Sequence, residues 1–411
     1  MNLYQIDKNI YGFSFQKYNF EKAKKEDLIN SDKIYYLFEN DPLKSRRSYI
    51  VSSPSLLSLK KENINILNNN KDNIVVDEWL KEKIDSKKVI ALNISYPNWK
   101  DVLHQKLRES WNVNILALGD VGTTLLTGLK LLGGNKISKI GIYDRTLEKQ
   151  QRWEMEMNQV YSAFNYNTPE VKIINKDEIF DCDMFVFCAS KSVPKVGSDI
   201  KDVRMAQFES NSKIIKEYAI QARKENFKGI FAVVSDPVDL LSKVVFLESN
   251  KDENNNMDFL GLAPEQIRGY GLGVMNARAV YYSKKDSKLN HFLKEGRAFG
   301  PHGKGLIIAD SIKNYNDNLS LYLTDKAKNA NLEMRELGFK PFIAPALSSG
   351  ALSIMDTING NWHYSATFIG GVFMGSKNKL KYNTIELEQL NLHDNLFSRI
   401  KETYETLGEI I

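Results

Sequence analysis

Between residues 112 and 249 short apolar runs alternate with longer amphipathic stretches, and this alternation constrains the fold more than any other feature. The runs have the length of strands, and the stretches between them have helical spacing. Strands that follow one another through helices pair in parallel, with right-handed crossovers. We therefore expect an α/β fold built on a Rossmann-type, doubly wound parallel sheet. The strand-like runs are NVNILALGD, KIGIYD, VKIIN, DMFVFCAS and GIFAVVSD.

Two further regions flank this sheet. Residues 1–111 combine short alternating runs with two amphipathic stretches, VVDEWLKEKI (75–84) and NWKDVLHQKLRESW (98–111). They predict a small N-terminal α+β domain that a helical pair docks onto the rest of the chain. Residues 250–411 mix helices with shorter strands and are expected to form an α+β catalytic domain. The N-terminal strands are expected at IYYLFEN, RSYIVSS, NINIL and KVIALNIS, and the three predicted domains are 1–111, 112–249 and 250–411.

The first apolar run ends in a glycine turn, ALGDVG (117–122), that leads into a helical stretch. Gly119 lets the backbone approach a pyrophosphate, and Gly122 lets the helix pack closely on the strand; the usual first glycine is Ala117. Asp144 ends the next strand, where a carboxylate can accept both hydroxyls of an adenosine ribose. An acid at that position repels a 2′-phosphate, so the sequence predicts NAD in preference to NADP.

Composition excludes several classes of protein. The net charge of +5 comes from 56 basic and 51 acidic residues that are interleaved along the chain, so we expect no nucleic-acid partner. Cys182 and Cys188 have no histidine near them in sequence and give neither a disulfide framework nor a metal-ligand spacing, so no metal is expected. The sequence shows no secretory leader and no apolar run of ~18 residues, so we expect a cytoplasmic protein without a membrane contact.

Six further motifs follow the glycine turn along the chain. They are DMFVFCAS (183–190), DVRMAQFESN (202–211), VVSDPVDLL (233–241), GYGLGVMNARAVYY (269–282), GPHGKG (300–305) and SSGALSIMDTI (348–358). With these motifs in this order, the chain resembles the lactate/malate dehydrogenase family from about residue 112 to residue 376. The resemblance implies an NAD-dependent oxidoreductase that transfers a hydride between nicotinamide and a small 2-hydroxy or 2-oxo acid, as a homodimer or homotetramer. Residues 1–111 lie outside it.

The resemblance also implies roles for single residues. His302 falls on the catalytic histidine, Arg204 on the arginine that polarises the substrate carbonyl, and Arg278 on the arginine that binds the substrate carboxylate. Two arginines and a histidine suit a small anionic substrate that exchanges a proton. Asp236 and Ser349 fall on substrate-binding positions. The cofactor-binding positions are Gly119, Asp120, Val121, Gly122, Asp144, Ala189 and Asn211.

Two positions depart from the family's pattern. Met275 occupies the place of the aspartate that holds the histidine, and a thioether cannot accept a useful N–H hydrogen bond. Asp236 replaces an asparagine, and we expect it to face the substrate and nicotinamide and not to become the missing partner of His302. Two alternatives stay open: an NAD-dependent reductase of an amine- or imine-bearing substrate, or a non-catalytic NAD-binding protein. The segment 190–203 should select the substrate, and its two aspartates and lack of arginine argue against a dicarboxylate.

Overall fold

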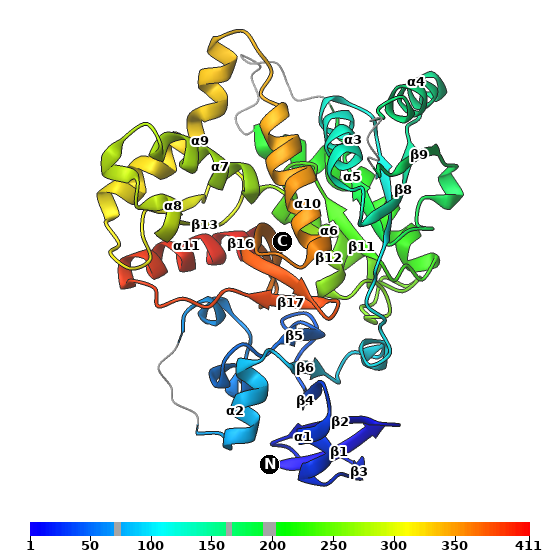
Figure 1. Cartoon of the computed structure of the whole chain (residues 1–411), viewed down its shortest axis with the longest axis vertical. Coiled ribbons are helices and arrows are strands. Elements are labelled where there is room, and N and C mark those ends of the chain that lie inside the picture. The colour runs from blue at the N-terminus through cyan, green and yellow to red at the C-terminus, as the bar shows by residue number, and fades with distance from the viewer. Residues whose placement is uncertain (70–74, 162–166, 192–202) are drawn as a thin grey trace.

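The computed structural model describes residues 1–69, 75–161, 167–191 and 203–411, with the side chains of 203 and 204 left out (Figure 1). A nine-stranded sheet in the order β17-β16-β15-β12-β11-β10-β7-β8-β9 forms the centre of the molecule. Its parallel part consists of β7 (Trp111–Leu116), β8 (Ile137–Tyr143), β9 (Glu170–Ile173), β10 (Met184–Phe187), β11 (Ile230–Val233) and β12 (Ile267–Gly269). The strand order reverses between β7 and β10, which is the doubly wound arrangement. The prediction of a Rossmann-type parallel sheet is confirmed.

Four long helices connect the parallel strands: α3 (Asp120–Leu132), α4 (Leu147–Asn158), α5 (Val203–Lys224) and α6 (Val238–Ser249). Every residue of β10 and β11 is buried. A strand that is covered on both faces reads as a continuous apolar run, which is why the sequence located these strands well.

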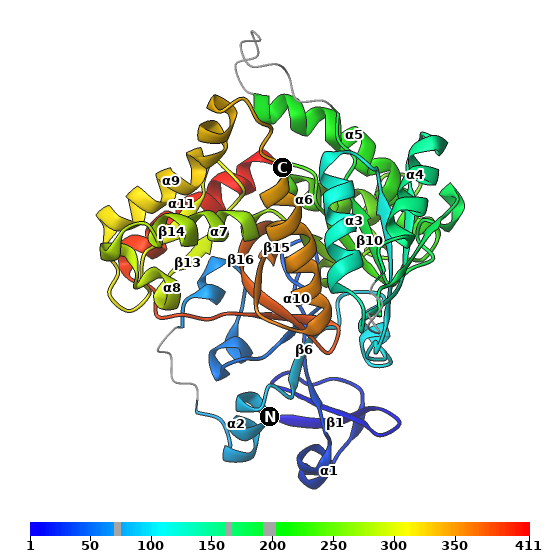
Figure 2. The same ribbon diagram turned by 45° about the horizontal axis from the view of Figure 1, so that its top comes forward.

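The C-terminal region extends the sheet with three antiparallel strands, β15 (His363–Ile369), β16 (Val372–Lys381) and β17 (Thr384–Leu387). A separate hairpin joins β13 (Arg297–Phe299) to β14 (Ile307–Ala309). The segment formed by η7 (Pro345–Leu352) and α10 (Ser353–Asn359) runs alongside α3 (Figure 2). The other helices of this region are α7 (Leu272–Ser283), α8 (Phe292–Glu295), α9 (Asp317–Glu336) and α11 (Asp394–Ile410).

The N-terminal region forms a second sheet of six strands. In spatial order they are β3 (Glu21–Lys22), β1 (Asn2–Asp7), β2 (Ile10–Ser14), β4 (Ile34–Phe38), β6 (Val89–Asn93) and β5 (Ser48–Ile50), accompanied by α1 (Lys25–Asn30) and α2 (Glu78–Asp85). The strand expected at 63–67 is wrong: η2 (Ile64–Leu67) is a 3₁₀ helix, because the Asn63 side chain accepts a hydrogen bond from the Asn65 N–H and starts a turn.

The helical pair expected to dock this region is also wrong, because within 98–111 only η3 (Trp99–Val102) is helical. The two regions meet through β5, which packs beside β17 (Figure 1). One hydrophobic core contains Phe13 of β2 and Leu28 of α1 together with Ile385 of β17 and Ile400 of α11. The domain limits drawn at 111 and 249 stay a prediction.

Candidate functional site

The residues that follow β7, β10 and β11 meet at one edge of the sheet. An ideal Cβ on Gly122 would lie 3.5 Å from the Cβ of Cys188, just after β10. The Ser235 hydroxyl, just after β11, donates to the carbonyl of Ala189 at 2.6 Å. These are the carboxyl ends of parallel strands at the point where the strand order reverses, which is where open α/β sheets bind ligands.

The glycine turn between β7 and α3 has the shape of a pyrophosphate site. A side chain at Gly122 would overlap the carbonyl oxygen of Ala117, so the close approach requires glycine. At Gly119 the space around an added Cβ is open to 4 Å, and the N-terminus of α3 begins one residue later. Free backbone N–H groups at a helix N-terminus favour phosphate oxygens. The residues present therefore fit a dinucleotide. Asp120, the first residue of α3, is 3.4 Å from Lys340.

Asp144 lies beside this turn. Its two carboxylate oxygens accept the backbone N–H groups of Leu118 at 2.8 Å and Thr146 at 3.0 Å. A carboxylate oxygen can accept more than one hydrogen bond, so both oxygens keep capacity for a ligand hydroxyl. The ribose-binding role of Asp144 stays a prediction, and the structure adds that this side chain holds the turn.

His302 has a carboxylate partner, and it is Asp236. The Nδ1 atom of His302 lies 3.0 Å from Oδ1 of Asp236. The expectation that Asp236 leaves the histidine without a carboxylate is wrong. The loop from β13 to β14 places His302 next to the N-terminus of α7, since an ideal Cβ on Gly271 would lie 3.1 Å from the His302 Cβ. The contact with Asp236 also places His302 at the carboxyl end of β11. No local sequence pattern reports that placement.

Arg278 lies in the second turn of α7. Its Nη1 is 3.2 Å from the carbonyl oxygen of Ala327 in α9 and 3.5 Å from the sulfur of Met275. Burial lowers the pKa of Arg278, and the nearby Tyr282 and Asp236 act in the opposite direction. Among the described side chains, none makes a carboxylate ion pair with Arg278 within 4.0 Å. Its charge is therefore placed to attract an anion.

Asn211 and Ser349 are buried, and the side chains of both form hydrogen bonds with backbone groups. The Asn211 amide accepts from the Lys191 N–H at 3.0 Å and donates to the Asp236 carbonyl at 2.8 Å. The Ser349 hydroxyl donates to the Gly271 carbonyl and accepts from the Val274 N–H, both at 2.8 Å, and so caps α7. Their ligand-binding roles stay predictions, as do those of Val121 and Ala189.

Arg204 and the segment expected to select the substrate are the remaining candidates. Arg204 lies in the first turn of α5, and its side chain is outside the described residues. Residues 192–202 are outside them as well. The partnership that the sequence reasoning missed, Asp236 with His302, did leave a signal: a carboxylate appears at 236 while one is missing at 275.

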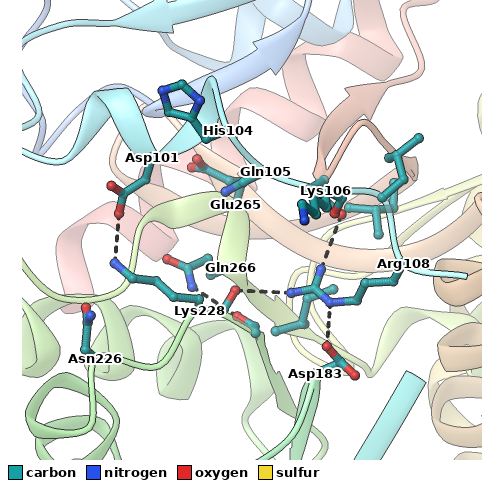
Figure 3. Close-up of a pocket in the computed structure, with 15 residues that line it drawn as sticks. Asp101, His104, Gln105, Lys106, Arg108, Asp183, Asn226, Lys228, Glu265 and Gln266 are labelled. Atoms are coloured by element: carbon teal, nitrogen blue, oxygen red, sulfur yellow. Dashed lines mark hydrogen bonds and ion pairs between the residues drawn. The ribbon is translucent and has the colours of Figure 1, made fainter. Parts of the chain in front are cut away.

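A cavity of about 620 Å³ lies at the opposite edge of the sheet, next to the amino ends of β10 and β11 (Figure 3). The segment 101–108 borders it and is held by ion pairs of Asp101 with Lys228 at 2.8 Å and Arg108 with Asp183 at 2.7 Å. None of the predicted site residues lines it.

The described residues contain no group of three His, Cys, Asp or Glu side chains suited to a metal ion. Nor does the described part of the chain contain a helix that is long and apolar enough to cross a membrane.

The fold and the site together define a Rossmann-type nucleotide-binding protein with a histidine–carboxylate pair at the carboxyl edge of its sheet. Residues 111–258 match the family model "lactate/malate dehydrogenase, NAD binding domain". The chain is 21% identical over 201 residues to an L-lactate dehydrogenase of Mycoplasmoides gallisepticum, covering 49% of this chain and 58% of that one. It is 22% identical over 196 residues to a malate dehydrogenase of Sulfurisphaera tokodaii, covering 48% of this chain and 57% of that one.

Solved structures agree on the fold. The minor L-lactate dehydrogenase of Enterococcus mundtii superposes with a TM-score of 0.59 at 17% identity, covering 74% of this chain and 98% of that one. The malate dehydrogenase of Archaeoglobus fulgidus, solved with NADH, superposes with a TM-score of 0.58 at 16% identity, covering 72% and 97%. The chain is thus similar to lactate/malate dehydrogenases in sequence over its NAD-binding part, and in fold over 74% and 72% of its length for these two structures. Its aligned part spans a little over half the length of these two sequence relatives, with 58% and 57% of them covered.

Proposed function

We propose that this chain is an NAD-dependent oxidoreductase that transfers a hydride between nicotinamide and a small 2-hydroxy or 2-oxo acid. The observation that carries the proposal is the His302–Asp236 pair at 3.0 Å. It lies on the same edge of the sheet as the glycine turn. Nearby, Arg278 makes no carboxylate ion pair among the described residues. A proton-transfer group, a cation for a carboxylate and a dinucleotide-binding turn are the groups that this chemistry needs.

Bound NAD supplies the hydride acceptor or donor. The glycine turn and the N-terminus of α3 bind its pyrophosphate, and Asp144 accepts from its adenosine ribose. Arg278 binds the substrate carboxylate through its planar fork, and Arg204 stabilises charge on the carbonyl oxygen. His302 takes the proton of the 2-hydroxyl group as the hydride leaves the same carbon, and returns a proton to the carbonyl oxygen in the reverse direction.

The two alternatives lose the observations that suggested them. The amine or imine reductase required Asp236 as an anion left free for a cationic substrate, but its carboxylate is paired with His302. The non-catalytic protein was suggested by a histidine without a carboxylate, and His302 has one. The lack of arginine in 190–203 still favours a monocarboxylate over a dicarboxylate.

We further propose that the protein is a homo-oligomer. Large apolar side chains are exposed along the end of α9 and the segment after it, and exposed apolar patches are typical of surfaces that associate. The most exposed of them are Leu337 (70%), Phe339 (68%) and Ile343 (59%). Light scattering on the purified chain tests this, and a monomer at all concentrations would contradict it.

Following NADH absorbance over a panel of 2-oxo acids tests the activity. We expect turnover with at least one small monocarboxylate, and loss of turnover in His302→Gln. Arg278→Lys keeps the charge but loses the planar fork, so it should raise KM by about ten-fold with a smaller effect on kcat. Unchanged kinetics in both variants would show that the substrate lies elsewhere.

Cofactor choice is tested at Asp144. A carboxylate that accepts two ribose hydroxyls contributes on the order of 1.5–3 kcal/mol, so Asp144→Ala should weaken NADH binding by about ten-fold or more. Because Asp144 also accepts from Leu118 and Thr146, Asp144→Asn is the matched variant: it keeps the size and one acceptor oxygen and should lose less affinity. Equal affinity of the unmodified protein for NADH and NADPH would contradict the assignment.

A further inference from the structure

We propose that Asn211, Asp236 and His302 form a hydrogen-bonded chain that positions the proton-transferring imidazole from the β11 side of the site. In this arrangement Asp236 is a positioning residue, and Met275 offers no carboxylate that would pair with Arg278. The part of the proposal that concerns turnover rests on the proposed function. The part that concerns the state of the imidazole rests on the contacts alone.

The first link fixes which nitrogen of His302 exchanges the proton. An ionised carboxylate can only accept hydrogen bonds, so the Nδ1 atom, 3.0 Å from Asp236, carries a hydrogen. The neutral ring then has its lone pair on Nε2. The histidine side chain is 18% exposed, so its ring is largely enclosed while the site still reaches solvent. Nε2 is therefore the atom that takes up and returns the substrate proton.

The second link holds Asp236 itself. Its side chain is 43% exposed, and such a side chain would be free to turn away if its backbone were not fixed. Asn211 is fully buried and donates its amide N–H to the Asp236 carbonyl at 2.8 Å. The oxygen of the same amide accepts from the Lys191 N–H at 3.0 Å, so Asn211 joins the residues after β10 to those after β11. Asn211 therefore acts on the histidine through Asp236.

The third observation concerns α7. The sulfur of Met275 is 3.5 Å from Nη1 of Arg278, and Met275 is buried. A carboxylate at that distance would form a partly buried ion pair with Arg278 and would compete with the substrate anion. Placing the positioning carboxylate just after β11 gives His302 its partner without adding a carboxylate beside Arg278 on α7. Met275 is thus a specificity-determining residue, because its uncharged thioether does not compete with the substrate carboxylate for Arg278.

The state of His302 can be measured without turnover. The chain has five histidines, so a long-range ¹H–¹⁵N spectrum of the full-length protein labelled at histidine can be assigned with His302→Gln. In the unmodified protein we expect the His302 signals of a ring protonated at Nδ1 only. In Asp236→Ala that single form should give way to a mixture of the two neutral forms. Asp181→Ala removes an exposed carboxylate just before β10, at the opposite edge of the sheet, and is the matched control.

Kinetics supply the second readout. Asp236→Ala should lower kcat by about 100-fold or more, because the ring is no longer held in one form, while NADH affinity stays within about two-fold. Asp236→Asn keeps an acceptor oxygen and should fall between Asp236→Ala and the unmodified protein. Asn211→Ala should lower kcat and leave NADH affinity within about three-fold. A loss of NADH affinity with normal kcat would instead make Asn211 a cofactor ligand and overturn the second link.

Met275→Asp completes the test. As a single change it should raise the substrate KM by about ten-fold, because the new carboxylate pairs with Arg278; an unchanged KM would overturn the third observation. If the spectrum of Asp236→Ala still shows only the Nδ1-protonated form of His302, the first link is overturned, whatever the activity of the variant. If no 2-oxo acid is reduced by the unmodified protein but the spectrum changes as expected, the proposed function fails and the positioning chain stands.

Discussion

Arg268 and His363 are buried next to one another in the face of the sheet that α10 covers. Arg268 donates to the side-chain oxygen of Asn378 at 2.9 Å and lies 3.5 Å from Nε2 of His363. In the described part of the chain its other two nitrogens, Nε and Nη2, have no hydrogen-bond partner. His363 Nδ1 is 3.1 Å from the Asn361 carbonyl, so it donates there and Nε2 accepts. Burial, together with the charge of Arg268, lowers the pKa of His363 from 6.5 to about 3. The imidazole is neutral in the folded protein.

This histidine makes the fold sensitive to acid. The folded pKa is lower than the unfolded one, so the stability it confers is complete above pH 6.5 and is lost as the pH falls toward 3. At pH 4.5 the penalty is about 2–3 kcal/mol. We expect His363→Gln to lose less free energy of unfolding than the unmodified protein between pH 7.5 and pH 4.5. Urea unfolding at both pH values measures this, with the exposed His104→Gln as control; equal losses in all three proteins would contradict it.

Single residues were predicted unevenly, for a physical reason. The roles proposed for Asp144, Arg278 and His302 were suggested by their motifs and stay predictions. The pairing of Asp236 with His302 depends on where a loop crosses a strand end 66 residues away along the chain, which no local pattern encodes. The same holds for Asn211, whose two backbone contacts join different strand ends.

At the scale of elements, the turn between β7 and α3 contains a strained residue. Ala117 has a φ of +76°, in the left-handed region that costs a residue with a side chain about 1–2 kcal/mol. Gly122 approaches its carbonyl closely, so the turn cannot relax by moving toward the helix. The sequence had shown that the usual first glycine is replaced here, and the structure shows that the backbone keeps the glycine conformation.

We therefore expect Ala117→Gly to stabilise the protein by roughly 0.5–1 kcal/mol, after the entropy that glycine adds to the unfolded chain. The midpoint of thermal or urea unfolding measures the change. Ala330→Gly, in the right-handed interior of α9, is the matched control and should destabilise by about 1 kcal/mol. A loss of stability in Ala117→Gly would mean that the turn gains from the methyl group.

Elements buried on both faces were the most predictable ones. The strands and helices of 112–249 appear where their patterns predicted them, and β10 and β11, which are buried throughout, have no polar face to obscure the pattern. Residues 98–111 have helical spacing but form only η3, because tertiary ion pairs hold Asp101 within η3 to Lys228 and Arg108 after it to Asp183. Tertiary contacts overrode local propensity there.

At the scale of the whole molecule, a buried ion pair joins the N-terminal region to the rest of the chain. Arg47 of the N-terminal region donates to Glu265 at 2.8 Å, and the two side chains are 2% and 1% exposed. The Ser48 hydroxyl donates to the same carboxylate oxygen at 2.9 Å. Together with the shared hydrophobic core, this pair indicates that the N-terminal region and the nucleotide-binding body unfold together.

We expect Arg47→Met to destabilise the whole protein by about 3–5 kcal/mol, because it leaves Glu265 buried without its cation. Arg47→Met combined with Glu265→Leu should recover a large part of that loss. Denaturant unfolding followed by fluorescence and by NADH binding should show one coincident transition. The exposed pair of Lys88 and Asp32 offers the control, and Lys88→Met should change little. Two separate transitions would instead show that residues 1–111 fold on their own.

The shared core also has a consequence for biosynthesis. A ribosome makes the first sheet well before β17 and α11, which complete its core. The Asn69 N–H even donates to the carbonyl of Leu390. A nascent chain that has not yet passed residue 400 therefore holds an early sheet with an uncovered apolar face, which is a surface that chaperones recognise and that aggregates readily. The first sheet should therefore reach its final packing only after the residues of β17 and α11 have left the ribosome.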